Sequence, residues 1–186
     1  ASWEIIQDMK NGTPMNRLLQ GDVGSGKTMV AAISALNAVR AGFQVAVLAP
    51  TEILASQLAE NFEKSLRGQE VRVAFLSGSV KGKARKTLYE KLEAGEIDIL
   101  VGTHAIIQEK VKFSRLGLVV IDEQHRFGVA QRQKILEKSA QKMPHLLAMT
   151  ATPIPRSLQL TLFGDLSVSI LREKPKGRKP ILTEVI

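Results

Sequence analysis

Cysteine is absent from the 186-residue sequence, which also has only three histidines. Disulfide bonds and thiolate metal sites are therefore excluded, and a zinc site has too few ligands to be expected. A chain without cysteine is compatible with a cytoplasmic location. Signal peptides and long apolar segments are missing as well, so we expect a soluble protein that has no membrane partner.

Aromatic residues are also scarce, at 4% of the chain. Trp3 and Tyr89 lie on separate predicted helices, so they do not form a platform on which bases could stack. We expect Trp3 to pack against the rest of the protein from the first helix.

Positive charge, by contrast, is in excess, with 26 Lys and Arg against 18 Asp and Glu, a net charge of +8. This excess favours a polyanionic partner such as nucleic acid, although a basic surface can also serve solubility alone. The segment "SVKGKARK" at 79–86 has the same two interpretations, as a contact with DNA phosphates or as the solvated start of a helix.

Apolar runs alternate with helical patterns along the chain, which predicts an α/β fold with a mainly parallel sheet and helices on both faces. Ligands of such sheets bind beyond the carboxyl ends of the strands. The predicted strands are 16–20, 44–50, 71–77, 97–103, 116–122, 145–150 and 166–171. The predicted helices are a first helix that contains Trp3, then 28–41, 51–66, 83–95, a stretch within 128–141, and 155–163.

The segment "GDVGSGKT" matches the phosphate-loop pattern G-x-x-x-x-G-K-[ST] at every position, between a predicted strand and a predicted helix. Glycines let the backbone approach a ligand closely, and the loop amides then point at anionic oxygens. Lys27 is expected to reach the β- and γ-phosphates, and Thr28 to hold Mg²⁺. The predicted nucleotide-binding residues are Gly21, Asp22, Val23, Gly24, Ser25, Gly26, Lys27 and Thr28.

A second candidate follows the apolar strand in "LVVIDEQH". Asp122 is placed to hold Mg²⁺, directly or through water, and Glu123 to orient and activate the attacking water. An acidic pair after a strand is also common as a solvated turn. The glycine-rich loop about a hundred residues upstream favours the catalytic interpretation.

A third candidate is "MTATPIPRSL", in which Thr150 and Thr152 follow another predicted buried strand. Two hydroxyls at a strand end can link the acidic site to a neighbouring surface by hydrogen bonds. A turn rich in threonine and proline is the alternative interpretation.

The motifs GDVGSGKT, APTE, VGTHA, DEQH and TATPIPR occur here in the order and spacing of motifs I, Ia, Ic, II and III of superfamily 2 helicases and translocases. The longer forms "DEQHRFGV" and "TATPIPRSL" resemble a narrower group that contains two bacterial families. These are the RecG helicases of branched DNA and, as the alternative, the transcription-repair coupling translocases called Mfd.

This resemblance implies a RecA-like P-loop NTPase domain that uses ATP and Mg²⁺ and acts on DNA, whether branched, duplex or single-stranded. It implies catalytic roles for Lys27, Asp122 and Glu123, with Thr28 and Asp122 at the metal. Coupling of the nucleotide site to DNA is implied for Gln124, His125, Thr150 and Thr152. Contacts with the DNA sugar-phosphate backbone are implied for Thr51, Thr103 and His104.

The resemblance also implies parts that this sequence lacks. An adenine-contacting glutamine would precede Ala1, and the second RecA-like domain, with its arginine finger, and the wedge domain are absent. We therefore expect a bacterial cytoplasmic helicase fragment: a motor domain at 1–171, then a basic linker and the start of the next domain at 172–186. Without the arginine finger, which contributes about 10³–10⁵ in rate, its own ATP hydrolysis is expected to be negligible.

Two other functions remain as alternatives. A small-molecule kinase or a GTPase would share the phosphate loop, but the sequence has neither an N-K-x-D-like motif nor an arginine-rich lid. A non-catalytic nucleic-acid-binding module would leave the loop and the Asp122–Glu123 pair unexplained.

Overall fold

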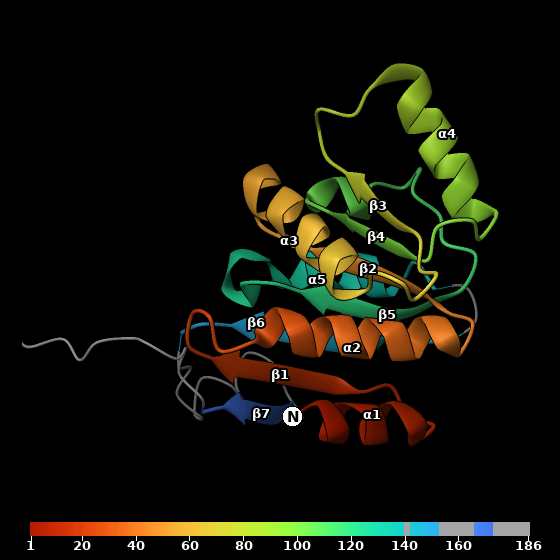
Figure 1. Ribbon diagram of the computed structural model, residues 1–186. Helices are drawn as coiled ribbons and strands as arrows, with labels where there is room; N and C mark the ends of the chain where they lie inside the picture. The colour runs from red at the N-terminus through yellow and green to blue at the C-terminus, as the bar shows by residue number, and fades with distance from the viewer. Residues whose placement is uncertain (140–141, 153–165, 173–186) are drawn as a thin grey trace, which may run out of the picture.

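The computed structural model describes residues 1–139, 142–152 and 166–172, apart from the side chain of His125. Seven parallel strands form one sheet in the order β3-β4-β2-β5-β6-β1-β7 (Figure 1). The strands are β1 (Asn16–Gly21), β2 (Gln44–Leu48), β3 (Val73–Leu76), β4 (Ile99–Gly102), β5 (Leu116–Ile121), β6 (His145–Thr150) and β7 (Ser167–Leu171). The predicted parallel sheet is confirmed.

Helices cover both faces of this sheet, as predicted. On one face α1, α2 and α3 contribute to the hydrophobic core, and on the other face α4, α5 and the short helix η1 do so. No helix in the described ranges is long and apolar enough to span a membrane. The helices are α1 (Ser2–Lys10), α2 (Lys27–Arg40), α3 (Glu52–Ser65), α4 (Gly82–Glu93) and α5 (Val129–Leu136), with the 3₁₀ helices η1 (His104–Ile107) and η2 (Gln124–Arg126).

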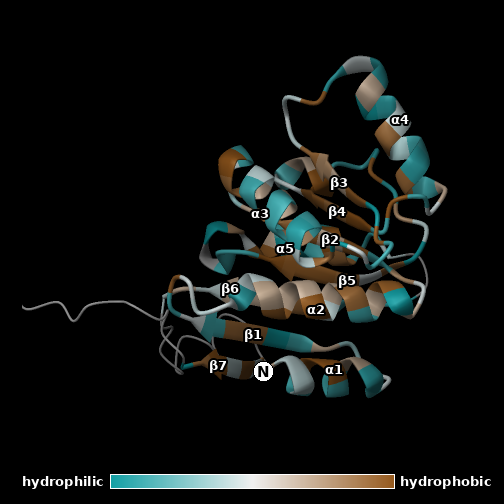
Figure 2. Ribbon diagram, in the orientation of Figure 1, coloured by the Kyte–Doolittle hydropathy of each residue, from teal (hydrophilic) through white to brown (hydrophobic). Residues whose placement is uncertain are grey.

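The central strands are apolar on both faces because both faces are covered. In β2, Val45 and Val47 pack into the core beneath α2 and α3, whereas Ala46 and Leu48 pack into the opposite core. This alternation follows from the two-residue period of a strand. Figure 2 shows the same pattern: the central strands are hydrophobic, and much of the outlying α4 is hydrophilic.

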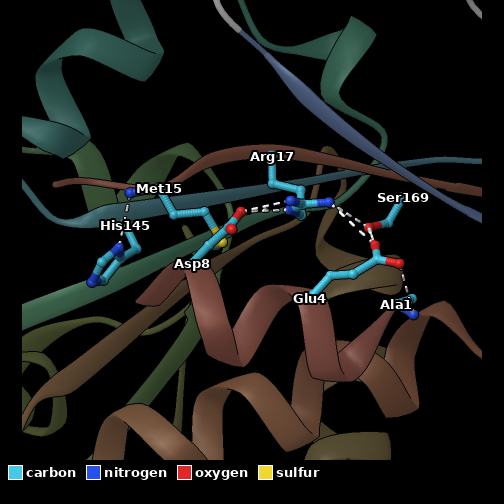
Figure 3. A network of polar contacts seen from close by, with 7 residues as sticks. All are labelled: Ala1, Glu4, Asp8, Met15, Arg17, His145 and Ser169. Carbon is cyan, nitrogen blue, oxygen red and sulfur yellow. Dashed lines mark hydrogen bonds and ion pairs between the residues drawn. The ribbon is translucent and has the colours of Figure 1, made fainter. Parts of the chain in front are cut away.

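One buried cation ties the N-terminal helix to the edge of the sheet (Figure 3). Arg17 of β1 donates from Nε and Nη2 to Asp8 Oδ2, at 2.9 and 2.7 Å, and from Nη1 to Ser169 Oγ of β7, at 2.7 Å. Glu4 Oε2 lies 3.3 Å from Nη1 and also accepts a hydrogen bond from Ser169. The network joins α1, β1 and β7, so it anchors the strand that leads to the phosphate loop.

The expectation that Trp3 packs against the protein is wrong. Its side chain is 71% exposed, and Ile5 is the residue of α1 that is fully buried. Of the predicted segments, the helix at 155–163 lies outside the described residues, as does the linker at 172–186 except for its first residue.

Candidate active site

Three neighbouring strands end side by side at the carboxyl edge of the sheet and carry predicted nucleotide-binding, metal-binding and coupling residues. The glycine-rich loop follows β1, Thr150 ends β6, and Asp122 follows β5 directly. Because β6 lies between β1 and β5, Thr150 stands between the loop and the acid. The fold therefore brings together residues that are about 30 to 130 positions apart in sequence.

The loop has the backbone that its glycines predict. Gly24 and Gly26 have φ values of 79° and 93°, in the left-handed region that other residues rarely adopt. A Cβ atom on Gly21 would lie 2.5 Å from Ser25 Oγ and 3.0 Å from Leu171 Cβ. Glycine at position 21 thus lets the loop fold closely over the end of β1.

The start of α2 is suited to an anion. The N-cap residue is Gly26, no side chain caps the helix, and its first turn contains no acidic residue. The first N–H groups of an α-helix have no partner within the helix, and the helix dipole adds positive charge there. Ser25 Oγ is buried and has no hydrogen-bond partner in the described part of the chain. These donors fit a phosphate group.

The Lys27 ammonium lies across the loop itself. Its Nζ donates to the backbone oxygens of Gly21 and Asp22, at 2.7 and 2.9 Å. The Val23 N–H donates a hydrogen bond to Asp22 Oδ1 at 2.8 Å, which stabilises the loop at these two residues. The cation is therefore held at the mouth of the loop, where the predicted phosphates would lie.

Asp122 lies at the same edge of the sheet, near Lys27; the phosphate loop, Lys27 and Asp122 together are called the nucleotide pocket below. Burial raises the pKa of its carboxyl group above the ordinary value, the Glu123 charge raises it further, and the Lys27 ammonium acts in the opposite direction. Lys27 is thus close enough to Asp122 for their charges to interact. The Asp122 N–H donates to Leu48 O at 2.8 Å, and Glu123 turns away from the strand with a φ of 49°.

The arrangement fits a metal-bound triphosphate. An oxygen ligand set for Mg²⁺ needs only one or two protein groups beside the phosphates. The partly buried Thr28 begins α2 just after Lys27, and the Asp122 carboxylate approaches from β5. The start of α2 and the end of β5 therefore supply one cation, one hydroxyl and one carboxylate at the same edge of the sheet.

The predicted coupling residues lie beside this pocket. Thr150 Oγ1 and Thr152 Oγ1 are 3.0 Å apart, and the Thr152 N–H donates to Thr150 Oγ1 at 3.2 Å. Gln124 is 1% exposed, and in the described part of the structure neither Oε1 nor Nε2 has a hydrogen-bond partner. The side chain of His125 lies outside the described residues.

The three predicted DNA-contacting residues lie farther along the same edge, after β2 and β4. Thr51 is exposed and caps α3, with Oγ1 accepting from the Leu54 N–H at 3.3 Å. Thr103 is only 5% exposed, because it forms the N-cap of η1. His104 is exposed beside it. The surface at this point is thus formed by Thr51 and His104 rather than by the Thr103 hydroxyl.

Sequence reasoning missed one polar cluster at this part of the edge. Glu52 Oε1 accepts hydrogen bonds from Ser77 Oγ, at 2.8 Å, and from Ser79 Oγ. The hydrogen bonds from Ser79 and Ser77 lower the pKa of Glu52. The glutamate stands inside the quoted APTE motif, but the two serines lie about 25 residues away, and local sequence gives no signal that joins them.

Comparison with known proteins shows the family of this chain. The sequence model of the DEAD/DEAH box helicase family matches residues 2–161. The ATP-dependent DNA helicase RecG of Aquifex aeolicus (strain VF5) is 53% identical over 182 residues, which are 98% of this chain and 23% of that protein. The RecG of Bacillus subtilis (strain 168) is 57% identical over 180 residues, 97% of this chain and 26% of the relative.

Solved structures give the same result. A structure of RecG bound to a three-way DNA junction matches with a TM-score of 0.81 and 44% identity, over 97% of this chain and 24% of that chain. A DEAD box protein from Methanococcus jannaschii shares the fold, with a TM-score of 0.65 and 23% identity over 91% of this chain and 48% of that chain. The chain spans about a quarter of the RecG proteins that it matches. The chain belongs to the DEAD/DEAH box helicase family, and its fold is the RecA-like fold of that family's motor domains.

Proposed function

We propose that this chain is the ATP-binding motor domain of a RecG-type helicase, which couples ATP hydrolysis to translocation along branched DNA. The observation that carries the proposal is that the phosphate loop and Asp122 lie together at the carboxyl edge of the sheet. There the Lys27 ammonium lies across the loop at the uncapped start of α2, near enough to Asp122 for their charges to interact. The RecG names of the relatives favour this assignment over an Mfd translocase.

Each residue of the pocket has a role that its chemistry supports. Lys27 and the loop amides bind the β- and γ-phosphates, while Thr28 and Asp122 hold Mg²⁺. When bound, the metal neutralises charge on the phosphoryl group. Glu123 accepts a proton from the attacking water and orients it.

The residues proposed to couple the nucleotide site to DNA lie along the carboxyl edge of the sheet. Thr150 and Thr152 form a hydrogen-bonded pair beside the acid, and Gln124 has a buried amide group that can take a new partner when the pocket closes. Thr51, His104 and the backbone at Thr103 contact the sugar-phosphate chain. Such contacts position a strand without reading its sequence, which suits a motor that moves along any DNA.

The whole reaction requires more than this domain. We infer that residues 1–171 form the first motor domain and 172–186 lead to a second RecA-like domain, with a wedge domain elsewhere in the full-length protein. The second domain supplies the arginine finger, which contributes about 10³–10⁵ in rate. The isolated chain therefore binds nucleotide but hydrolyses it very slowly.

The test is a calorimetric titration of Mg·ATP against the wild-type chain, Lys27→Ala and Lys110→Ala. Lys110 is an exposed lysine between η1 and β5 that has no predicted contact with nucleotide, so its variant controls for the loss of one positive charge. We expect Lys27→Ala to weaken binding at least about tenfold, since hydrogen bonds to charged groups contribute roughly 1.5–3 kcal/mol. Equal affinities in all three proteins would refute the assignment. A hydrolysis rate for the isolated chain close to that of a full-length helicase would refute the need for the second domain.

A further inference from the structure

A cavity of about 660 Å³ lies at the amino edge of the sheet, opposite the edge that carries the phosphate loop. It is bounded by the segments that precede β1 and β6, the end of α2 and the start of β5. Small-molecule sites in proteins commonly have volumes of roughly 300–1,000 Å³. None of the residues assigned to nucleotide or DNA lines it, so the cavity has no role in the function proposed above.

The wall of the cavity includes apolar side chains that the described part of the protein leaves uncovered. Phe43 is 38% exposed and Met143 is 62% exposed, and both line the cavity together with Met9. Phe43 packs closely over Gly117, because a Cβ atom on Gly117 would lie 2.6 Å from the Phe43 Cβ. The phenyl ring therefore lies between the backbone of β5 and the cavity.

The ionisable side chains that line the cavity are all basic. They are Arg115, Lys142 and the titratable ring of His145, and no aspartate or glutamate is among the lining residues. The Arg115 guanidinium lies 5.1 Å from the centre of the Phe43 ring. Its backbone N–H donates to Gln44 Oε1 at 3.0 Å, so this residue is anchored at its main chain as well.

The hydrogen bond from Met15 determines which ring nitrogen of His145 can donate. Its Nδ1 accepts the Met15 N–H at 2.9 Å, and Figure 3 shows the other ring nitrogen pointing away from Met15. In the neutral ring Nε2 must then carry the proton. An anion in the cavity can therefore receive a hydrogen bond from His145 without any change in its charge.

We propose that this cavity binds a small organic anion. Its aromatic or aliphatic body lies against Phe43 and Met143, and its carboxylate, sulfonate or phosphate group lies at Arg115, with Lys142 and His145 as further donors. The concave shape and the presence of three basic residues in the lining of one cavity favour a compact ligand over an extended chain. This inference is independent of the proposed motor function.

The test uses two fluorescent probes that share one ring system. The first, 8-anilinonaphthalene-1-sulfonate, is anionic, and the second, N-phenyl-1-naphthylamine, lacks the sulfonate. Loss of one charge-assisted contact in Arg115→Gln should weaken the sulfonate probe about tenfold and leave the neutral probe nearly unchanged. Lys110→Gln removes an equal charge elsewhere and should change neither probe. Ala41→Phe, which places a ring in the cavity, should weaken both probes.

Methyl NMR locates the probe and supplies a second readout should Arg115→Gln fail to fold. The chain has five methionines. The methyl signals of Met9 and Met143 should shift when the sulfonate probe binds to the wild-type chain. Met29, which is 50% exposed in the first turn of α2, should not shift. Displacement of the probe by Mg·ATP, a shift confined to Met29, or equal weakening by Arg115→Gln and Lys110→Gln would overturn the proposal.

Discussion

Replacing Arg17 by methionine should destabilise the chain strongly, although Arg17 lies outside the nucleotide pocket. The Arg17 side chain is 11% exposed, and its main partner Asp8 is 28% exposed. Methionine keeps the apolar stem but leaves the Asp8 carboxylate and the Ser169 hydroxyl without their donor. Breaking a buried pair by removing one partner costs roughly 3–5 kcal/mol. Because Asp8 keeps some access to water, we expect about 3 kcal/mol.

For a domain of this size, about 1 kcal/mol corresponds to a shift of roughly 2–4 °C in Tm. Arg17→Met should therefore lower Tm by about 6–12 °C, as measured by thermal unfolding followed by circular dichroism. The matched control is Lys64→Met, which breaks an exposed pair with Glu60. Exposed pairs contribute only about 0.2–1 kcal/mol, so this control should change Tm by less than about 4 °C.

A double variant tests the pairing of Asp8 with Arg17 directly. Asp8→Ala should be costly in the wild-type chain and nearly neutral once Arg17 has become methionine, because the carboxylate then has no cation to satisfy. Additive losses, or a Tm for Arg17→Met no lower than that of the Lys64 control, would show that the network does not anchor β1. Nucleotide affinity below the transition should stay unchanged, because Arg17 is the second residue of β1 and the loop lies at the other end of that strand.

Three further predictions concern the pocket and the sheet edges. Because burial raises the pKa of Asp122, its ionised form destabilises the fold at neutral pH. Asp122→Asn should therefore raise Tm at pH 7, and this gain should vanish as the pH falls toward 3.8, the ordinary pKa of the group. Burial lowers the pKa of His145 below 6.5, so below this pH the unfolded chain binds a proton more readily than the folded chain, and stability should fall with pH. His145→Gln should flatten the dependence of Tm on pH between 7 and about 5. Gly21→Ala should weaken Mg·ATP about tenfold in a calorimetric titration, whereas Gly78→Ala, whose Cβ would meet nothing within 4 Å, should not.

The order of elements could be predicted from the sequence because apolar runs and glycine signals are local. The glycine-rich loop and Asp122 follow such runs directly, so their meeting at one edge follows from the parallel sheet alone. The order of strands in the sheet was not predicted, since nothing local says that β6 separates β5 from β1.

The features that the sequence did not reveal depend on contacts between distant segments. Arg17 forms a hydrogen bond with Ser169, which is 152 residues away in sequence, and the Glu52 carboxylate accepts one from Ser77, which is 25 residues away. The wrong expectation for Trp3 has a similar origin. A short amphipathic helix can bury only one stripe, and in α1 that stripe contains Ile5 rather than the larger tryptophan.

Glycine at position 102 shows how tertiary packing fixes a residue within a predicted strand. A Cβ atom there would lie 1.9 Å from Leu76 O on the neighbouring strand. The strand pattern alone could not predict this close approach, because it gives no information on the neighbour. The buried Thr103 that follows has a local role instead, because it is the N-cap of η1.

A double-mutant cycle on Mg·ATP affinity tests most directly whether Lys27 and Asp122 act on one nucleotide. Calorimetry would compare the wild-type chain, Lys27→Met, Asp122→Asn and the double variant. If a metal-bound triphosphate bridges the two side chains, the losses should be non-additive by about 0.5–3 kcal/mol. Losses that add within about 0.3 kcal/mol, as for distant and independent sites, would contradict the shared pocket on which the motor assignment depends.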